Sequence, residues 1–138
     1  MVKESFIPLE LKSQLSFDSG ENNNTINKGS NAELLVKEWM ASLGNRDFKK
    51  AYELMTRKKG GDFGKFSSTK GYGGITKTNL ISCTLDKEDG SSAEVIAEYE
   101  AFDPQNHNGK FCQRFILTKQ NDKWLISEIK NIYHTLYN

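Results

Sequence analysis

Few residues in this chain are of types that carry out covalent chemistry. The chain has two histidines, His107 and His134, and two cysteines, Cys83 and Cys112. This number excludes a zinc cluster built from these ligands and a multi-disulfide scaffold. Neither histidine has a carboxylate and a nucleophile close by in sequence, so no catalytic triad is indicated. The strongest candidate for acid–base chemistry is a carboxylate, Glu128, because of its place in the predicted sheet.

Glu128 is predicted to lie among apolar residues that face the core. A two-residue turn at 121–122 sets the register of the last two strands and places Glu128 opposite Phe115. The same reasoning places Tyr99 opposite Gln113 on this inner face. A carboxylate against an apolar layer either has a raised pKa or is solvated at an open mouth.

Two interpretations of these inward polar residues stay open. In the first they line a small-molecule pocket, where Glu128 is an acid, a base or an anchor. In the second Glu128 is a solvated residue at the edge of the sheet or pairs with a lysine. The residues expected around the pocket are Trp39, Tyr52, Tyr99, Gln113 and Glu128.

Two helices are predicted ahead of the strands. Ser30 and Glu33 form a candidate capping box, and apolar residues then recur at helical spacing as far as Gly44, which ends the helix. Asn45 is the candidate cap of the second helix. The apolar face of that helix comprises Phe48, Ala51, Tyr52 and Met55.

The segment 58–74 contains six glycines and several lysines. A phosphate loop has four residues between its glycines and Ser or Thr after its lysine, whereas here three residues separate the glycines and a phenylalanine follows the lysine. Nucleotide binding is therefore not expected, and a mobile loop with one helical turn around 62–67 is favoured. Its lysines could meet an anionic partner, although such charge runs usually are solvated surfaces. They are Lys58, Lys59, Lys65 and Lys70.

Four strands are predicted after this segment, over 75–87, 93–102, 110–120 and 123–132. Helices followed by an antiparallel meander indicate an α+β fold, with two to three N-terminal helices packed on a four-stranded antiparallel sheet.

The first hairpin decides where the cysteines point. A three-residue loop with Gly90 in the left-handed conformation turns Ile81 and Cys83 inward. Cys112 faces outward two strands away, so a disulfide between the cysteines is excluded. On the last strand Ile132 is also predicted to face inward.

The outer face of the sheet is predicted to carry an apolar stripe among charged residues. Such a stripe usually marks a partner, a second copy of the chain or a cover from the chain itself. The apolar N-terminal segment and the residues 132–137 are both available as covers, and self-coverage and a partner stay open. The candidate interface residues are Ile96, Arg114, Ile116 and Ile129.

The chain is long enough for one domain. It has 138 residues, of which the first 30 are expected to form an N-terminal segment with a polar linker and 31–138 a single α+β domain. Lys plus Arg number 19 and Asp plus Glu 18, a balance that argues against a nucleic-acid binder. No apolar run is long enough to span a membrane, and polar residues interrupt any signal-peptide core in the first segment.

Two stretches resemble the nuclear-transport-factor-2-like superfamily. Residues 47–55, DFKKAYELM, resemble the family's second helix, which has the form D-[FY]-x-x-A-Y-x-L. Residues 121–126, NDKWLI, resemble its last hairpin, a dipeptide turn followed by W-x-I. The resemblance covers about residues 31–132. It implies a curved sheet wrapped on helices, forming a cone with a pocket.

The resemblance implies two functions from different classes. The superfamily includes ketosteroid isomerases and dehydratases, but no catalytic residue of theirs can be matched here. It also includes non-enzymatic modules of the bacterial envelope, which the separate N-terminal segment resembles more closely. The favoured hypothesis is therefore a non-catalytic assembly domain, extracytoplasmic with its signal or anchor outside this chain, that uses a protein partner or a homodimer and no cofactor. The alternative is a binder or enzyme for a small apolar ligand.

Overall fold

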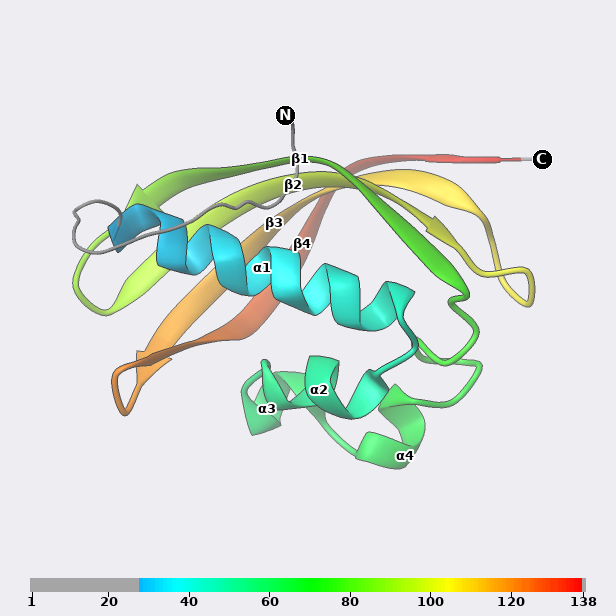
Figure 1. Ribbon diagram of the computed structural model, residues 1–138, viewed down its shortest axis with the longest axis horizontal. Helices are drawn as coiled ribbons and strands as arrows, with labels where there is room; N and C mark the ends of the chain where they lie inside the picture. Colours follow the sequence, from blue (N-terminus) through cyan, green and yellow to red (C-terminus); the bar gives the residue numbers. More distant parts are fainter. Residues whose placement is uncertain (1–27, 138) are drawn as a thin grey trace.

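The computed structural model describes residues 28–137. Its elements are α1 (Lys28–Gly44), α2 (Phe48–Glu53), α3 (Arg57–Gly60), α4 (Phe63–Phe66), β1 (Lys77–Glu88), β2 (Ser92–Phe102), β3 (Gly109–Gln120) and β4 (Lys123–Leu136). The strands form one antiparallel sheet in the order β1-β2-β3-β4. The sheet arches over α1, and α2, α3 and α4 form a lobe on the side of α1 away from the sheet (Figure 1). The α+β prediction is confirmed, with four helices in the described part of the chain. Of the predicted N-terminal segment, residues 1–27 lie outside the described residues, whereas 28–30 begin α1.

Helix α1 buries one apolar stripe against the sheet, as its spacing predicts. The stripe is Ala32, Val36, Trp39, Met40 and Leu43, all fully buried. Glu33 does not take part in the predicted capping box, because its carboxylate accepts the backbone N–H of Leu85 on β1 at 2.7 Å. This bond ties the start of α1 to the edge of the sheet.

The three short helices of the lobe each begin at a side-chain cap. Asp47, Thr56 and Asp62 accept the backbone N–H three residues further on. The prediction of Asn45 as a cap is wrong, because Arg46 adopts a left-handed conformation (φ 61°) and moves the start of α2 to Asp47. Helix α4 confirms the predicted helical turn within the glycine-rich segment.

The end of the glycine-rich segment is packed closely against the rest of the fold. A Cβ atom at Gly73 would collide with the carbonyl oxygen of Ser67, and one at Gly74 would collide with the carboxylate of Asp103. Glycine is required here because the chain passes too close to its neighbours for any side chain.

Two predictions for the strands are confirmed. The inward residues of β2, Ala93, Val95, Ala97, Tyr99 and Ala101, are all buried. The β3–β4 hairpin closes through Asn121 and Asp122, both with positive φ, and pairs Gln120 with Lys123. Positive φ at both central residues is typical of the type I′ turn.

The β1–β2 hairpin differs from its prediction. Gly90 is not left-handed, because Asp89 organises the loop and its carboxylate accepts the N–H groups of the next two serines. A register irregularity after Leu80 leaves Ile81 49% exposed, so its predicted inward position is wrong. Cys83 remains inward and packs against the core.

A bulge at Ser127 changes the facing of β4. Ser127 has no partner on β3, because the ladder passes from Ile126 to Glu128. Glu128 is therefore turned outward and Ile129 lies inward, opposite Phe115. The predicted inward position of Glu128 and the predicted outward position of Ile129 are both wrong, because the turn alone does not reveal an extra residue further along.

A second irregularity follows at Ile132. The ladder passes from Asn131 to Tyr133, so Ile132 is extra and its predicted inward position is wrong. Beyond it, His134 pairs with Phe111 and their rings lie 6.2 Å apart. The end of β4 thus places His134 close to the inner face of the sheet.

Candidate functional site

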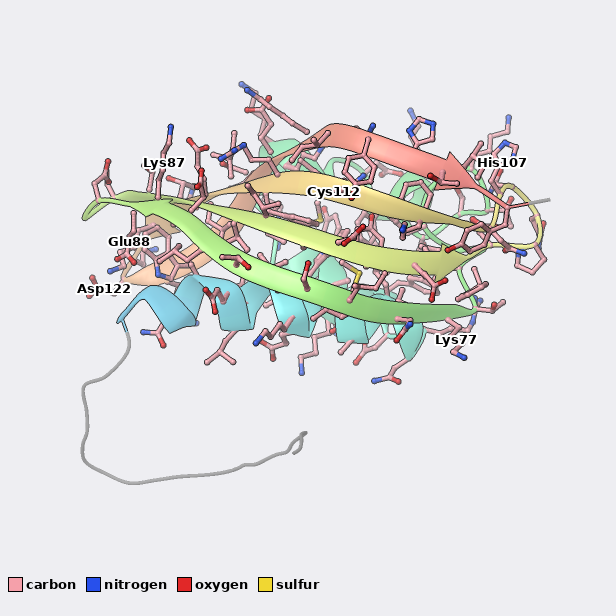
Figure 2. The ribbon with its side chains drawn as sticks, turned by 90° about the horizontal axis from the view of Figure 1, so that it is seen from above. Lys77, Lys87, Glu88, His107, Cys112 and Asp122 are labelled. Atoms are coloured by element: carbon pink, nitrogen blue, oxygen red, sulfur yellow. The ribbon has the colours of Figure 1, made fainter. Side chains whose placement is uncertain are left out.

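A pocket lies where β2 and β3 meet at their connecting loop. Its volume is about 340 Å³, and the segment before β1 closes one side of it. Its apolar and aromatic wall comprises Tyr72, Ile75, Tyr99, Ala101, Phe111 and Leu136, with Gln113 among them. His107, on the rim, marks this end of the sheet in Figure 2, whereas Lys87 and Asp122 mark the opposite end. We call this site the end pocket.

A partly buried hydrogen bond crosses the wall of the end pocket. The hydroxyl of Tyr99, 7% exposed, donates to Oε1 of Gln113 at 2.6 Å. The two residues are not opposite each other as predicted, since Tyr99 pairs with Phe111 and Gln113 pairs with Ala97. They are diagonal neighbours on one face, a distance that long side chains can bridge.

Burial keeps the phenols of the pocket protonated. It raises the pKa of Tyr99 well above the usual value, and the neighbouring Tyr72 raises it further. Burial likewise raises the pKa of Tyr72. Because desolvation disfavours the charged form, Tyr99 stays neutral and acts as a hydrogen-bond donor at neutral pH.

The amide nitrogen of Gln113 is available to a ligand. Its oxygen is engaged by Tyr99, and among the described residues its nitrogen has no hydrogen-bond partner. An amide NH₂ facing an apolar pocket favours a ligand with an acceptor such as a carbonyl or hydroxyl oxygen.

The rim of the end pocket carries the titratable groups. Asp103 is buried, and its carboxylate accepts the N–H groups of Gln105 and Asn106 and the side-chain amide of Asn106. These bonds hold the β2–β3 loop, so Asp103 has a structural role. His107 and Lys70 are exposed on the same rim.

The other predicted pocket residues lie elsewhere. Trp39 lies behind the pocket, its ring 5.4 Å from that of Tyr72, and its buried Nε1 has no partner among the described residues. Tyr52 donates to the carbonyl oxygen of Gly61 within the helical lobe. Glu128 is exposed in a second, polar pocket of about 620 Å³. Of the five residues, the structure brings together Tyr99 and Gln113.

Sequence reasoning missed most of the wall, including the aromatic residues Tyr72 and Phe111. Tyr72 comes from the glycine-rich segment, where the glycines indicate a loop and hide an aromatic residue that packs on the sheet. Phe111 fits the inward pattern of its strand, and that pattern could have placed it beside Tyr99, whose ring centroid is 5.6 Å away.

The predicted apolar stripe on the outer face is interrupted. Ile96 pairs with Arg114, and Ile129 belongs to the inner face. The guanidinium of Arg114 bonds the carboxylates of Asp86 (2.8 Å) and Glu94 (2.7 Å) across the sheet. This face is therefore more polar than predicted around its centre.

Near the C-terminus, the outer face of the sheet carries Tyr133 and Tyr137. The hydroxyl of Tyr133 donates to Glu98 at 2.8 Å, and that of Tyr137 donates to Glu100 at 2.7 Å. The bond to Glu98 raises the pKa of Tyr133 to about 12. Cys112 lies on this face, as predicted, and is buried there (Figure 2).

Comparisons with solved structures define the fold. The chain is similar to an NTF-2 like protein of unknown function from Shewanella oneidensis, with a TM-score of 0.61 and 7% identity over 76% of this chain and 98% of that one. A SEC-C motif containing protein from Rhodopseudomonas palustris gives 0.55 and 15%, covering 78% and 83% of the two chains. The intermembrane space region of chloroplast protein ARC6 gives 0.51 and 16%, covering 78% and 98%. The fold is NTF2-like.

Sequence comparison adds no assignment. No protein-family model matches the chain, and no curated protein matches it significantly. Within residues 28–137, no helix is long and apolar enough to cross a membrane. The same residues contain no group of three His, Cys, Asp or Glu that could hold a metal ion.

Proposed function

We propose that this protein is a binding module for a small, largely apolar molecule that carries one carbonyl or hydroxyl oxygen. The observation that carries the proposal is the hydrogen bond between Tyr99 and Gln113 inside an aromatic wall. A concave apolar site with a few fixed polar groups is the usual form of a small-molecule site, and about 340 Å³ is at the lower end of the usual range.

Binding rather than catalysis is supported by the state of the polar groups. Tyr99 is a neutral phenol at physiological pH, with a pKa that burial raises further, and Gln113 does not titrate in this range. The carboxylate of Asp103 is engaged by the loop that it organises. General acid–base catalysis needs a pair of groups with separated pKa values near the reacting atoms, and the wall offers two neutral groups instead.

The ligand test replaces the amide that faces the pocket. In Gln113→Leu the wall loses the amide donor, and the Tyr99 hydroxyl loses the acceptor that fixes it. We therefore expect small aromatic ketones and phenols to bind roughly five- to tenfold more weakly. Ligand-observed NMR titration measures this. The matched control is Gln120→Leu, which makes the same change on the exposed end of β3. Equal affinity of both variants for every ligand that binds would contradict the proposal.

The second candidate function is a non-catalytic assembly domain that uses the outer face, through a protein partner or a homodimer. It is favoured by exposed large side chains near the end of β4, namely Ile132, Tyr133 and Tyr137. Of the stripe predicted for this surface, Ile96, Arg114 and Ile116 remain on the outer face. The extracytoplasmic, bacterial envelope setting is a proposal from the family resemblance.

A further inference from the structure

The helical lobe, residues 46–70 with the helices α2, α3 and α4, is strongly basic. Residues 46–70 contain eight Lys or Arg and three Asp or Glu, a net charge of +5, in a chain whose net charge is +1. The other residues together are therefore net acidic. The lobe projects from α1 on the side away from the sheet (Figure 1). The charge is thus gathered on the side of the fold that lies opposite the sheet (Figure 1).

The lysine side chains of the lobe are exposed to solvent. All six are exposed: Lys49, Lys50, Lys58, Lys59, Lys65 and Lys70. Between described residues, Lys50 alone of these forms an ion pair, with Glu38 on α1 at 3.0 Å. The positive charge is therefore largely uncompensated within the described fold and attracts anions over a Debye length.

The two arginines of the lobe already have structural roles. The guanidinium of Arg46 donates to the carbonyl oxygens of Gly73 (3.1 Å) and Ile75 (2.6 Å). That of Arg57 lies over the ring of Tyr52, 4.6 Å from its centroid. Because both arginines are engaged, the charge that the lobe offers to a ligand comes from its lysines. Arginine binds a single phosphate in a fixed, bidentate geometry, whereas a lysine ammonium is a point charge on a flexible side chain.

An aromatic side chain projects from the same lobe. Phe63, at the start of α4, is 40% exposed. Its ring lies edge-on to Tyr52 (centroids 5.1 Å apart) and is stacked with Phe66 (6.4 Å), which fixes its position. A rigid exposed phenylalanine among lysines is typical of surfaces that lie in the headgroup region of a bilayer.

We propose that this lobe docks on an anionic phospholipid surface, with Phe63 entering the headgroup region and the lysines near the lipid phosphates. Diffuse lysine charge and one inserted aromatic ring suit a fluid surface of phosphates. Single-stranded nucleic acid is favoured less, because it is bound by successive aromatic stacking platforms, whereas Phe63 alone of the lobe's aromatic residues is exposed. The described residues outside the lobe are net acidic, which favours the lobe as the side that faces an anionic surface.

The test is vesicle flotation with the full chain. We expect binding to vesicles that contain phosphatidylglycerol, none to phosphatidylcholine alone, and loss of binding at high salt. Lys58→Glu/Lys59→Glu lowers the partition coefficient by ~tenfold or more, and Phe63→Ala lowers it without changing the salt dependence. The matched control, Lys37→Glu/Lys87→Glu, makes the same charge change on exposed residues of α1 and β1, outside the lobe, and keeps the binding.

Three outcomes would overturn the proposal. The first is no binding to anionic vesicles by the wild-type chain, and the second is an equal loss in the lobe variant and the control. The third is binding of a single-stranded oligonucleotide, measured by fluorescence anisotropy, that competes with the vesicles and is tighter at the same salt. Circular dichroism verifies that each variant is folded, and the exposed positions make unfolding an unexpected result.

Discussion

Cys83 lies on the inner face of β1, against the first turns of α1. Its Sγ is 3.8 Å from the carbonyl oxygen of Glu33. Burial raises the pKa of the thiol from its usual 9.0 to about 12. The thiolate is the reactive form, so this cysteine should behave as a small apolar side chain and not as a nucleophile.

The shifted pKa of Cys83 predicts a loss of stability at alkaline pH. Between pH 9.0 and about 12 the unfolded chain releases the thiol proton and the folded chain retains it. The unfolded state then binds fewer protons, so the free energy of unfolding falls as the pH rises through this window. Urea denaturation across the window measures the fall.

The control for this prediction is Cys83→Ala. Its alkaline fall should be shallower than that of the wild-type chain, because the buried tyrosines still titrate while the thiol is gone. Parallel curves for the two proteins would show that the Cys83 thiol is not protected by burial. Below pH 9.0 the thiol is protonated in both states and makes no contribution to the pH dependence.

At the scale of elements, the bulge at Ser127 decides which residue of β4 supports the core. Ile129 packs against the buried cluster, whereas Glu128 is exposed and lies 4.0 Å from Lys130. We therefore expect Ile129→Ala to lower the free energy of unfolding by about 2 kcal/mol. Glu128→Ala should change it by less than about 0.5 kcal/mol.

Chemical denaturation of the two alanine variants distinguishes the bulged strand from a regular one. The unbulged register would turn Glu128 toward the core and Ile129 toward solvent, and the order of the two effects would be reversed. A further variant of Glu128 tests the position of the ligand site. Glu128→Gln should leave ligand binding unchanged, because Glu128 does not line the end pocket.

The elements whose structure follows from a local sequence pattern could be predicted. The buried stripe of α1, the alternation of β2 and the turn at 121–122 all follow from periodicity and turn chemistry. The bulges at Ser127 and Ile132 could not, since each depends on how an extra residue is accommodated against β3. The helix cap at Asp47 was missed because Arg46 adopts an unusual conformation before it.

The site was predicted in part for the same reason. Tyr99 and Gln113 share a face because strand periodicity is local, and their facing was therefore predictable. Tyr72 reaches the pocket through tertiary packing of a glycine-rich segment, which no local period reveals. Glu128 was misplaced by one bulged residue, which shows how completely a single insertion reverses the two faces of a strand.

At the scale of the whole molecule, the end pocket and the basic lobe are formed largely by different elements. The walls of the pocket come mainly from β2, β3 and the segment before β1, while the charge of the lobe comes from residues 46–70. Ligand binding in the end pocket and vesicle binding by the lobe can therefore be tested independently. Gln113→Leu should leave vesicle binding unchanged, and Lys58→Glu/Lys59→Glu should leave ligand affinity unchanged.

The central claim is that the end pocket holds a small molecule, and native mass spectrometry of the purified full chain tests it most directly. The account predicts a chain of 15.7 kDa with additional small-molecule mass that is lost on denaturation and is reduced in Gln113→Leu. A bare chain at 15.7 kDa, or at twice that mass with nothing bound, would contradict the claim, and the doubled mass would favour the assembly function of the outer face.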